Sequence, residues 1–332
     1  MDPSANLDRS AFPFFVGRGR SGTTLLRAMF DAHPEMAVPD ESHFVVTLGR
    51  RRAEFEHQGG FRSELFIDHL FGRPAFKLWG LDRDELLNDF ERANPVDYPG
   101  AIRALYASYA RSQGKSRYAD KTPIYVLHIE FLSQLFPEAK FVHIIRDGRD
   151  VALSYLDMQW GPESVEEAAV YWKRFVKKGR SAGRSLGPSR YCEVKYERLL
   201  EDPEGIVRSL CSFLDLEFSD GMLRYFERAD KVAGAMNNPD ARKGLYLPPT
   251  KGLRDWRRDM SPRDRAVFDM LAGDLIEDLD YERSQDPLSF RDRAITWRRQ
   301  FDLEKDRYLR SRKKSRRSGG RRIVANQPPE RA

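Results

Sequence analysis

The stretch Phe14–Phe30, FFVGRGRSGTTLLRAMF, constrains the fold more than any other part of the chain. A short apolar run, Phe14–Val16, is suited to a buried strand, and Gly17 and Gly19 follow it. After Gly22, apolar residues recur at helical spacing, at Leu25, Leu26, Met29 and Phe30. The pattern predicts a strand, a glycine-rich turn and a helix start. This arrangement aims backbone N–H groups and the positive end of a helix dipole at one point.

The turn is therefore a predicted anion site, suited to a phosphorylated or sulfated ligand. Arg20 would add a cation, and Thr23 and Thr24 would add hydroxyl donors. A Walker-type nucleotide loop has Lys directly after its last glycine. Here Thr23 follows Gly22, which argues against an NTPase or a kinase. A glycine-rich turn that holds no ligand is the alternative.

Composition indicates one large α/β domain, alone or with appendages. The chain has 332 residues, of which 40% are apolar, and its net charge is +6. Much of the positive excess lies in 307–322, RYLRSRKKSRRSGGRR, which has few apolar residues. We expect this tail to be disordered and solvated. Contact with nucleic acid or an anionic surface is the alternative.

Neither metal, disulfide nor membrane signals stand out in the sequence. Cys192 and Cys211 form no metal or redox motif. The first 13 residues contain Asp2, Asp8 and Arg9 without a long apolar stretch, and no run of 18 apolar residues occurs. We therefore expect a cytoplasmic protein that has no membrane span and requires no metal.

Further strands and helices alternate along the chain. Phe141–Ile145 and Tyr191–Tyr196 are of strand length, and apolar spacing predicts helices over 123–136 and 165–180. Ser164, Asp202 and Ser261 stand at predicted helix starts. The alternation predicts a mostly parallel sheet flanked by helices. We expect an N-terminal segment over 1–11, a main domain over 12–290 with a helical acceptor-site insertion at 44–118, and a basic extension over 291–332.

Two further groups of polar residues follow predicted strands. A short strand at Met36–Val38 would deliver Glu41 to the carboxyl end of the sheet, where ligands of open α/β sheets bind. Arg146 would leave another strand tip, with Ser154 one turn into the next helix, and both could grip a second phosphate. Alternatively, Arg146 forms an ion pair with Asp147 or Asp150.

With these motifs in order, the sequence resembles a known family. GRSGTTLLRAMFDAHPE, then Glu41, then DKTP at 120–123 and LFPEAKFVHIIRDGRDVALS at 135–154 are similar to the sulfotransferases that use 3′-phosphoadenosine 5′-phosphosulfate (PAPS). The likeness is greatest to the protein-tyrosine sulfotransferase branch and its bacterial relatives, and it covers roughly residues 12–282. It implies a P-loop-like three-layer α/β fold.

The resemblance also implies roles for individual residues. The 5′-phosphosulfate would lie in the loop formed by Arg20, Ser21, Gly22, Thr23 and Thr24. Arg146 and Ser154 match the pair that binds the 3′-phosphate, and Tyr196 matches a tyrosine near the adenine. Glu41 falls at the position of the catalytic base, and Lys121 at that of a lysine that steadies the transferring group. The segment that begins Lys251-Gly252 is loosely similar to the late donor-binding segment.

The chemistry of sulfuryl transfer agrees with these roles. By analogy with phosphoryl transfer, it requires mainly in-line positioning and charge stabilisation. Arg20, Lys121 and the helix start should neutralise charge on the leaving phosphate oxygen. Beside these cations Glu41 stays ionised but is weakened as a base, so partial burial must counter them. His43 is the rival base.

The sequence leaves three candidate functions. The first is a PAPS-dependent sulfotransferase that releases adenosine 3′,5′-bisphosphate and acts on a hydroxyl-bearing acceptor of unknown class, with no nucleic acid required. The second is a nucleotide kinase on the same fold, disfavoured by Thr23. The third is a non-catalytic module that binds through the basic tail. The sequence leaves open whether the chain forms a homodimer.

Overall fold

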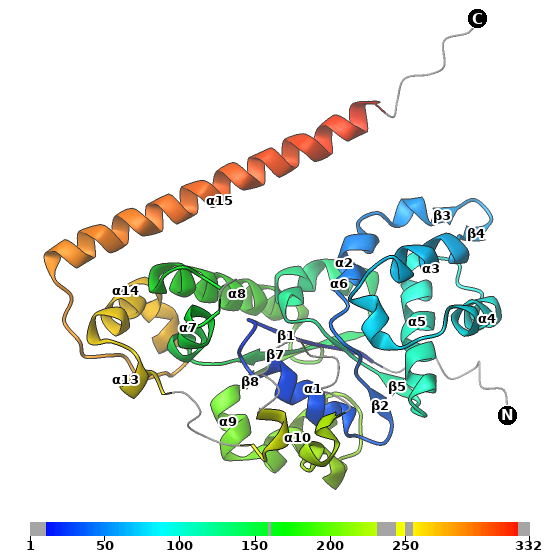
Figure 1. Ribbon diagram of the computed structural model, residues 1–332, viewed down its shortest axis with the longest axis horizontal. Coiled ribbons are helices and arrows are strands. Elements are labelled where there is room, and N and C mark those ends of the chain that lie inside the picture. Colours follow the sequence, from blue (N-terminus) through cyan, green and yellow to red (C-terminus); the bar gives the residue numbers. More distant parts are fainter. Residues whose placement is uncertain (1–10, 159–160, 231–243, 250–254, 325–332) are drawn as a thin grey trace, which may run out of the picture. The chain divides into compact units, whose positions relative to one another are not determined.

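The computed structural model describes residues 11–158, 161–230, 244–249 and 255–324 (Figure 1). Its contacts divide the chain into two compact units. Unit 1 comprises the described residues of Met1–Asp147 and Arg174–Leu253, and unit 2 those of Gly148–Lys173 and Arg254–Ala332.

A four-stranded parallel sheet forms the centre of unit 1. Its order is β6-β1-β7-β8, with β1 at Phe12–Gly17, β6 at Asp120–Lys121, β7 at Ala139–Ile145 and β8 at Tyr191–Lys195. Phe15 pairs with Lys121 on one side of β1, and Gly17 with Ile144 on the other. Since the strands are parallel, their carboxyl ends share one edge.

Both faces of this sheet are buried. Phe12, Phe14 and Val16 of β1 pack into one hydrophobic cluster, whereas Phe15 packs into a second cluster on the other face. The alternation is the two-residue period of a strand. Helix α1 (Thr23–Asp31) and α10 (Pro203–Phe213) contribute to the second cluster, and α6 (Ile129–Leu135) and α5 (Tyr98–Ser112) to the first. The chain therefore has the predicted three-layer α/β, P-loop-like fold.

Residues 44–118 are mainly helical. They contain α2 (Phe44–Gly49), α3 (Ser63–Phe71), α4 (Arg83–Ala93) and α5, two 3₁₀ turns, η2 (Arg52–Glu54) and η3 (Phe76–Trp79), and a small hairpin of β3 (Glu56–His57) and β4 (Gly60–Phe61). The short strand β2 (Met36–Ala37) pairs in parallel with β5 (Arg117–Tyr118). This pairing brings the two ends of the segment together, because β2 precedes the segment and β5 ends it.

Several helix starts follow from local sequence. The Asp202 side chain accepts a hydrogen bond from Gly205 N–H at the start of α10, and Ser261 accepts one from Asp264 N–H at the start of α14 (Pro262–Asp278). Glu167 N–H donates to Ser164 Oγ beside α8 (Val165–Leu186). Such caps satisfy backbone donors that the helix itself leaves unpaired.

Two predicted elements differ in their bounds. The helix expected over 123–136 begins instead as a 3₁₀ segment, η4 (Pro123–His128), and continues as α6. The strand expected to end at Tyr196 ends at Lys195, and Tyr196 opens α9 (Tyr196–Glu201). The other 3₁₀ turns among the described residues of unit 1 are η5 (Asp220–Met222), η6 (Tyr225–Arg228) and η7 (Gly244–Tyr246).

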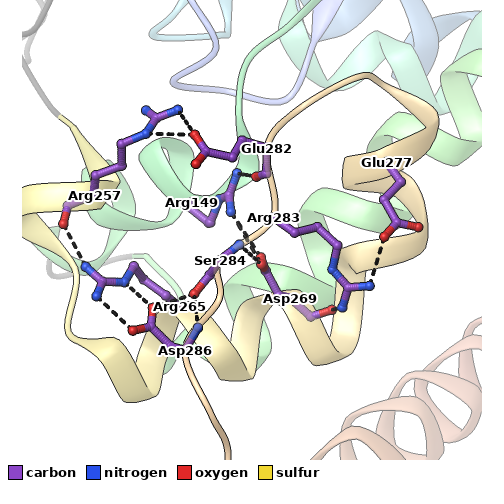
Figure 2. Close-up of polar contacts among 9 residues, drawn as sticks. All are labelled: Arg149, Arg257, Arg265, Asp269, Glu277, Glu282, Arg283, Ser284 and Asp286. Carbon is purple, nitrogen blue, oxygen red and sulfur yellow. Dashed lines mark hydrogen bonds and ion pairs between the residues drawn. The ribbon is translucent and has the colours of Figure 1, made fainter.

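Unit 2 is held together by a buried arginine. It contains α7 (Gly148–Leu156), the first part of α8, α13 (Trp256–Asp259), α14 and α15 (Phe290–Val324). Arg149 of α7 is fully buried, pairs with Asp269 of α14 at 3.3 Å, and stacks on Trp256 with its Cζ 3.5 Å from the ring centroid. Asp269 also accepts a hydrogen bond from Ser284 N–H at 2.6 Å (Figure 2).

Helix α15 continues to Val324 and so includes most of the segment, from about residue 307, for which composition predicts disorder. A physical reason lies in its many Arg and Lys residues, which have high helix propensity and lose little side-chain freedom in a helix.

Replacing Asp269 by Asn should destabilise unit 2 strongly, because it leaves the Arg149 guanidinium buried without its counter-charge. Breaking a buried pair in this way costs about 3–5 kcal/mol. Glu277→Gln is the matched control, since it breaks an exposed pair with Arg283, worth about 0–1 kcal/mol. Thermal unfolding followed by circular dichroism measures both. Equal shifts in melting temperature would contradict this account of the buried pair.

Candidate active site

The turn after β1 has the backbone features predicted for an anion site. Gly22 stands at the N-terminus of α1 with φ at +94°, and a Cβ there would lie 2.3 Å from Cδ2 of Tyr196, so only glycine fits. No side chain caps α1, and no acidic residue lies in its first turn. Its first N–H groups are thus free of side-chain caps and carry the positive end of the helix dipole. Ser21 Oγ is buried there with no hydrogen-bond partner.

Arg146 lies beside this turn. It follows β7, and its Nη1 donates a hydrogen bond to the Arg20 carbonyl oxygen at 3.4 Å. Its Cζ lies 4.9 Å from the centroid of the Tyr196 ring, which also packs on Gly22. The tips of β1, β7 and β8 therefore bring Arg20, Arg146 and Tyr196 together. Asp150, one of the ion-pair partners considered for Arg146, accepts a hydrogen bond from Trp256 N–H at 2.9 Å.

Glu41, Lys121 and His43 form a second cluster at the same edge. Lys121 Nζ lies 2.7 Å from Glu41 Oε1, and His43 Nε2 lies 3.2 Å from Glu41 Oε2. Lys121 is buried, whereas the Glu41 side chain is 36% exposed. Because Lys121 pairs with Phe15, two residues before Gly17, the cluster lies next to the strand that leads into the anion turn.

The charges of this cluster perturb one another. Burial raises the pKa of Glu41, but the positive charge of Lys121, together with hydrogen bonds from His43 and Lys121, outweighs it and lowers the pKa from 4.5 to about 2. The hydrogen bond with Glu41 raises the pKa of His43 above its ordinary 6.5. Glu41 is thus ionised at neutral pH. Its basicity depends on whether the Lys121 ammonium stays paired with it.

Sequence analysis missed the residues that hold Glu41 in place. Arg27 is buried in α1, where its Nε donates to the Val38 carbonyl at 3.1 Å and its Nη1 donates to Asp40 Oδ1 at 2.5 Å. Trp79 Nε1 donates to the Asp40 carbonyl at 3.1 Å. The backbone directly before Glu41 is therefore fixed on two sides. The one available signal was a cation, Arg27, between the apolar residues of a short helix.

A buried polar network holds the neighbouring positions. Ser42 N–H donates to Thr122 Oγ1 at 3.0 Å, and Ser42 Oγ lies 2.9 Å from the Tyr125 hydroxyl. Tyr106 OH donates to Asp120 Oδ2 at 2.5 Å. Burial raises the pKa of Asp120 despite these hydrogen bonds. The network joins the residues on either side of Lys121 to the residue that follows Glu41.

The other predicted site residues are placed as follows. Ser21, Thr23 and Thr24 lie in the anion turn and the start of α1. Ser154 lies in α7 of unit 2. Lys251 and Gly252 lie outside the described residues. Within the described ranges, no helix is long and apolar enough to cross a membrane, and no three His, Cys, Asp or Glu residues are grouped so that they could hold a metal ion.

Comparison with known proteins identifies the family. A profile described as "Sulfotransferase family" matches residues 13–220, which is more than half of the chain. The chain belongs to the sulfotransferase family. The match begins in β1 and includes the anion turn, the Glu41 cluster, Arg146 and Tyr196.

The chain is similar to protein-tyrosine sulfotransferases of animals and to a bacterial nodulation protein. Protein-tyrosine sulfotransferase 2 of Gallus gallus is 27% identical over 67% of this chain, which spans 55% of that protein. Nodulation protein NoeE of Sinorhizobium fredii is 23% identical over 82% of this chain and 66% of that protein. Among solved structures, the sulfotransferase domain of the Synechococcus PCC 7002 olefin synthase superposes with a TM-score of 0.59 and 25% identity, covering 82% of this chain and 96% of that one.

Lys121→Met should raise the pKa of Glu41 by about one to three units, because an adjacent opposite charge lowers a carboxyl pKa by this amount. The burial that opposes ionisation would then be countered by His43 alone. Carbon-13 NMR titration of the Glu41 carboxyl measures the shift. Lys178→Met, which breaks a surface pair with Glu130, is the control. An unmoved Glu41 pKa in Lys121→Met would show that Lys121 is not the dominant charge on it.

Proposed function

We propose that this sulfotransferase moves a sulfuryl group from PAPS to a hydroxyl acceptor by in-line displacement, with Glu41 as general base. The observation that carries the proposal is the position of the Lys121–Glu41 pair beside the strand that leads into an uncapped helix N-terminus. This arrangement puts a proton acceptor and a buried cation next to an anion site. These are the groups that transfer between two oxygens requires.

The donor's two anionic ends account for two sets of residues. The 5′-phosphosulfate lies in the turn of Arg20 to Thr24, where α1 N–H groups and the Ser21 hydroxyl donate to it. Arg146 binds the 3′-phosphate, and Tyr196 packs near the adenine; Ser154 is assigned to the same phosphate on resemblance alone. The Arg146–Arg20 contact supports one nucleotide that engages both turns. Lys251 and Gly252 are proposed to complete the donor site on resemblance alone.

In the transfer step, the acceptor hydroxyl gives its proton to Glu41 as its oxygen bonds to sulfur. The bond between sulfur and the 5′-phosphate oxygen breaks, and adenosine 3′,5′-bisphosphate leaves. Arg20, Lys121 and the start of α1 neutralise the negative charge that develops on the leaving oxygen. No metal ion takes part in this scheme.

Lys121 links donor binding to the strength of the base. Before the donor binds, Lys121 lowers the pKa of Glu41. A polyanionic donor competes for the same ammonium group. When Lys121 pairs with the donor, its ion pair with Glu41 weakens. Burial of Glu41 then dominates and raises its pKa towards the range of an effective base. His43, whose pKa is raised by Glu41, serves as a proton-bearing neighbour of the carboxylate.

We place the acceptor site in the helical segment 44–118. Its first helix begins three residues after Glu41, and Trp79 within it bonds to the Asp40 carbonyl oxygen. The acceptor therefore approaches the base through elements that also position the base. The names of the relatives in Gallus gallus and other animals suggest a tyrosine hydroxyl as one acceptor class to test.

Glu41→Gln should lower kcat for sulfuryl transfer about 10²–10⁴-fold, because general base catalysis contributes this much. Its affinity for adenosine 3′,5′-bisphosphate should not fall, since Gln keeps the shape of Glu and removes a negative charge. Labelled-sulfate transfer to a panel of hydroxyl acceptors measures the rate, with Glu130→Gln as the exposed control. Full activity of Glu41→Gln would show that Glu41 is not the base. Phosphoryl transfer from Mg·ATP without sulfuryl transfer from PAPS would show that the protein is a kinase and not a sulfotransferase.

Arg146→Ala should weaken binding of adenosine 3′,5′-bisphosphate about 10–100-fold, the value of one hydrogen bond to a charged group. Isothermal titration calorimetry measures the affinity. Arg208→Ala, which removes an exposed arginine paired with Glu204, is the control. Affinity for 5′-AMP should change little, since it lacks the 3′-phosphate. Equal losses for both nucleotides, or none, would contradict this role of Arg146.

A further inference from the structure

Helix α15 (Figure 1, orange to red) is anchored to the rest of unit 2 along one side of its first half. Thr296 is fully buried, Arg299 Nη1 donates to the buried Glu166 of α8 at 3.0 Å, and Arg263 of α14 lies 3.0 Å from Asp292. These contacts fix the orientation of the first half of the helix about its own axis.

The opposite side presents an exposed aromatic stripe, which we define as Phe290, Trp297 and Phe301. Their exposed fractions are 92%, 70% and 67%. Spacings of seven and four residues put them on one helix face. Every exposed Phe or Trp side chain among the described residues belongs to this stripe. Large aromatic side chains gathered on one exposed face mark an interaction surface.

The same helix carries the positive charge of the protein. Over Phe290–Val324 there are 14 Lys and Arg residues against four Asp and Glu, a balance of +10, whereas the whole chain has only +6. The rest of the chain is therefore negative. Long-range attraction to an anionic partner is concentrated on α15.

We propose that α15 is a peripheral membrane-binding helix that docks on anionic lipid. Aromatic side chains on one face insert at the headgroup level, and the basic residues bind the lipid phosphates. Pairing of α15 with the α15 of a second copy is disfavoured, because it would bring two strongly positive helices together. Nucleic acid would satisfy the charge but would leave the aromatic stripe without an apolar partner. This proposal does not depend on the reaction that the protein catalyses.

A cavity lies beside the stripe. It has a volume of about 650 Å³ and is bordered by Ala294 and Trp297 of α15. Met270 and Leu288 supply apolar lining, and the charged lining is mixed, with Asp269 and Asp286 facing it as well as Arg283 and Arg293. Its apolar walls extend the apolar surface of the stripe, whereas its mixed charges do not select for an anion.

The experiment is sedimentation of the full chain with vesicles of phosphatidylcholine alone or with 30% phosphatidylglycerol. We expect binding to the anionic vesicles only, weakening as salt rises. Trp297→Ser/Phe301→Ser should reduce the apparent affinity at least about tenfold, since two inserted aromatic side chains are lost. Arg312→Ser/Lys313→Ser/Lys314→Ser/Arg316→Ser should reduce it about 100-fold or more, because each basic residue near the surface contributes. Trp297 fluorescence, taken as the difference from Trp297→Phe, should shift to the blue on binding.

A charge-matched control removes four exposed basic residues elsewhere, at Arg62, Lys77, Arg224 and Arg228, and should bind as the wild type does. Circular dichroism confirms that each variant is folded. Three outcomes would overturn the proposal: no binding to anionic vesicles; tighter binding to duplex DNA that is unaffected by Trp297→Ser/Phe301→Ser; or a dimer in solution that this double variant dissociates.

Discussion

The parallel pairing of β1 with both β6 and β7 is the constraint on which the proposed site depends. Phe15 pairs with Lys121 and Gly17 with Ile144, so three strand tips end at one edge. The register brings the anion turn next to Lys121 and Arg146, which lie roughly 100 and 125 residues further along the chain. Gly17 permits this packing, since a Cβ there would lie 2.5 Å from the Ile144 carbonyl oxygen. The strand register of the sheet therefore determines which side chains can act together at the proposed site.

Electrostatic balance then determines what the cluster can do. A carboxylate beside a buried ammonium is stable but weakly basic, and Glu41 with its pKa of about 2 shows this conflict. In the proposed mechanism a donor anion that competes for the ammonium resolves this conflict, because only His43 then counters the effect of burial on the Glu41 pKa. The positioning contacts from Arg27 and Trp79 keep the carboxylate in place while the charges around it change. In the same way, the buried Arg149 of unit 2 depends on Asp269 for its counter-charge.

Helix α15 differs from the sheet and its flanking helices in the apolar residues that it exposes. In the sheet and its flanking helices, apolar residues are buried on both faces, whereas α15 buries one side and exposes aromatic residues on the other. Such exposure has a free-energy cost in water unless a partner covers it. The packed contacts of α15, at Asp292, Thr296 and Arg299, precede residue 307, from which composition predicts a solvated tail.

The sequence by itself determined the local elements: the strand and turn over 14–24, the helix caps at Ser164, Asp202 and Ser261, and the alternation that implies a parallel sheet. These depend on neighbours within a few residues, so pattern and propensity suffice. Resemblance then supplied the roles of Glu41, Lys121 and Arg146. Only the tertiary structure decided that Lys121 contacts Glu41, that Arg146 reaches the Arg20 turn, and that Arg27 and Trp79 position Asp40. Such contacts join distant segments, and their distances follow from strand register and core packing, which no local pattern encodes.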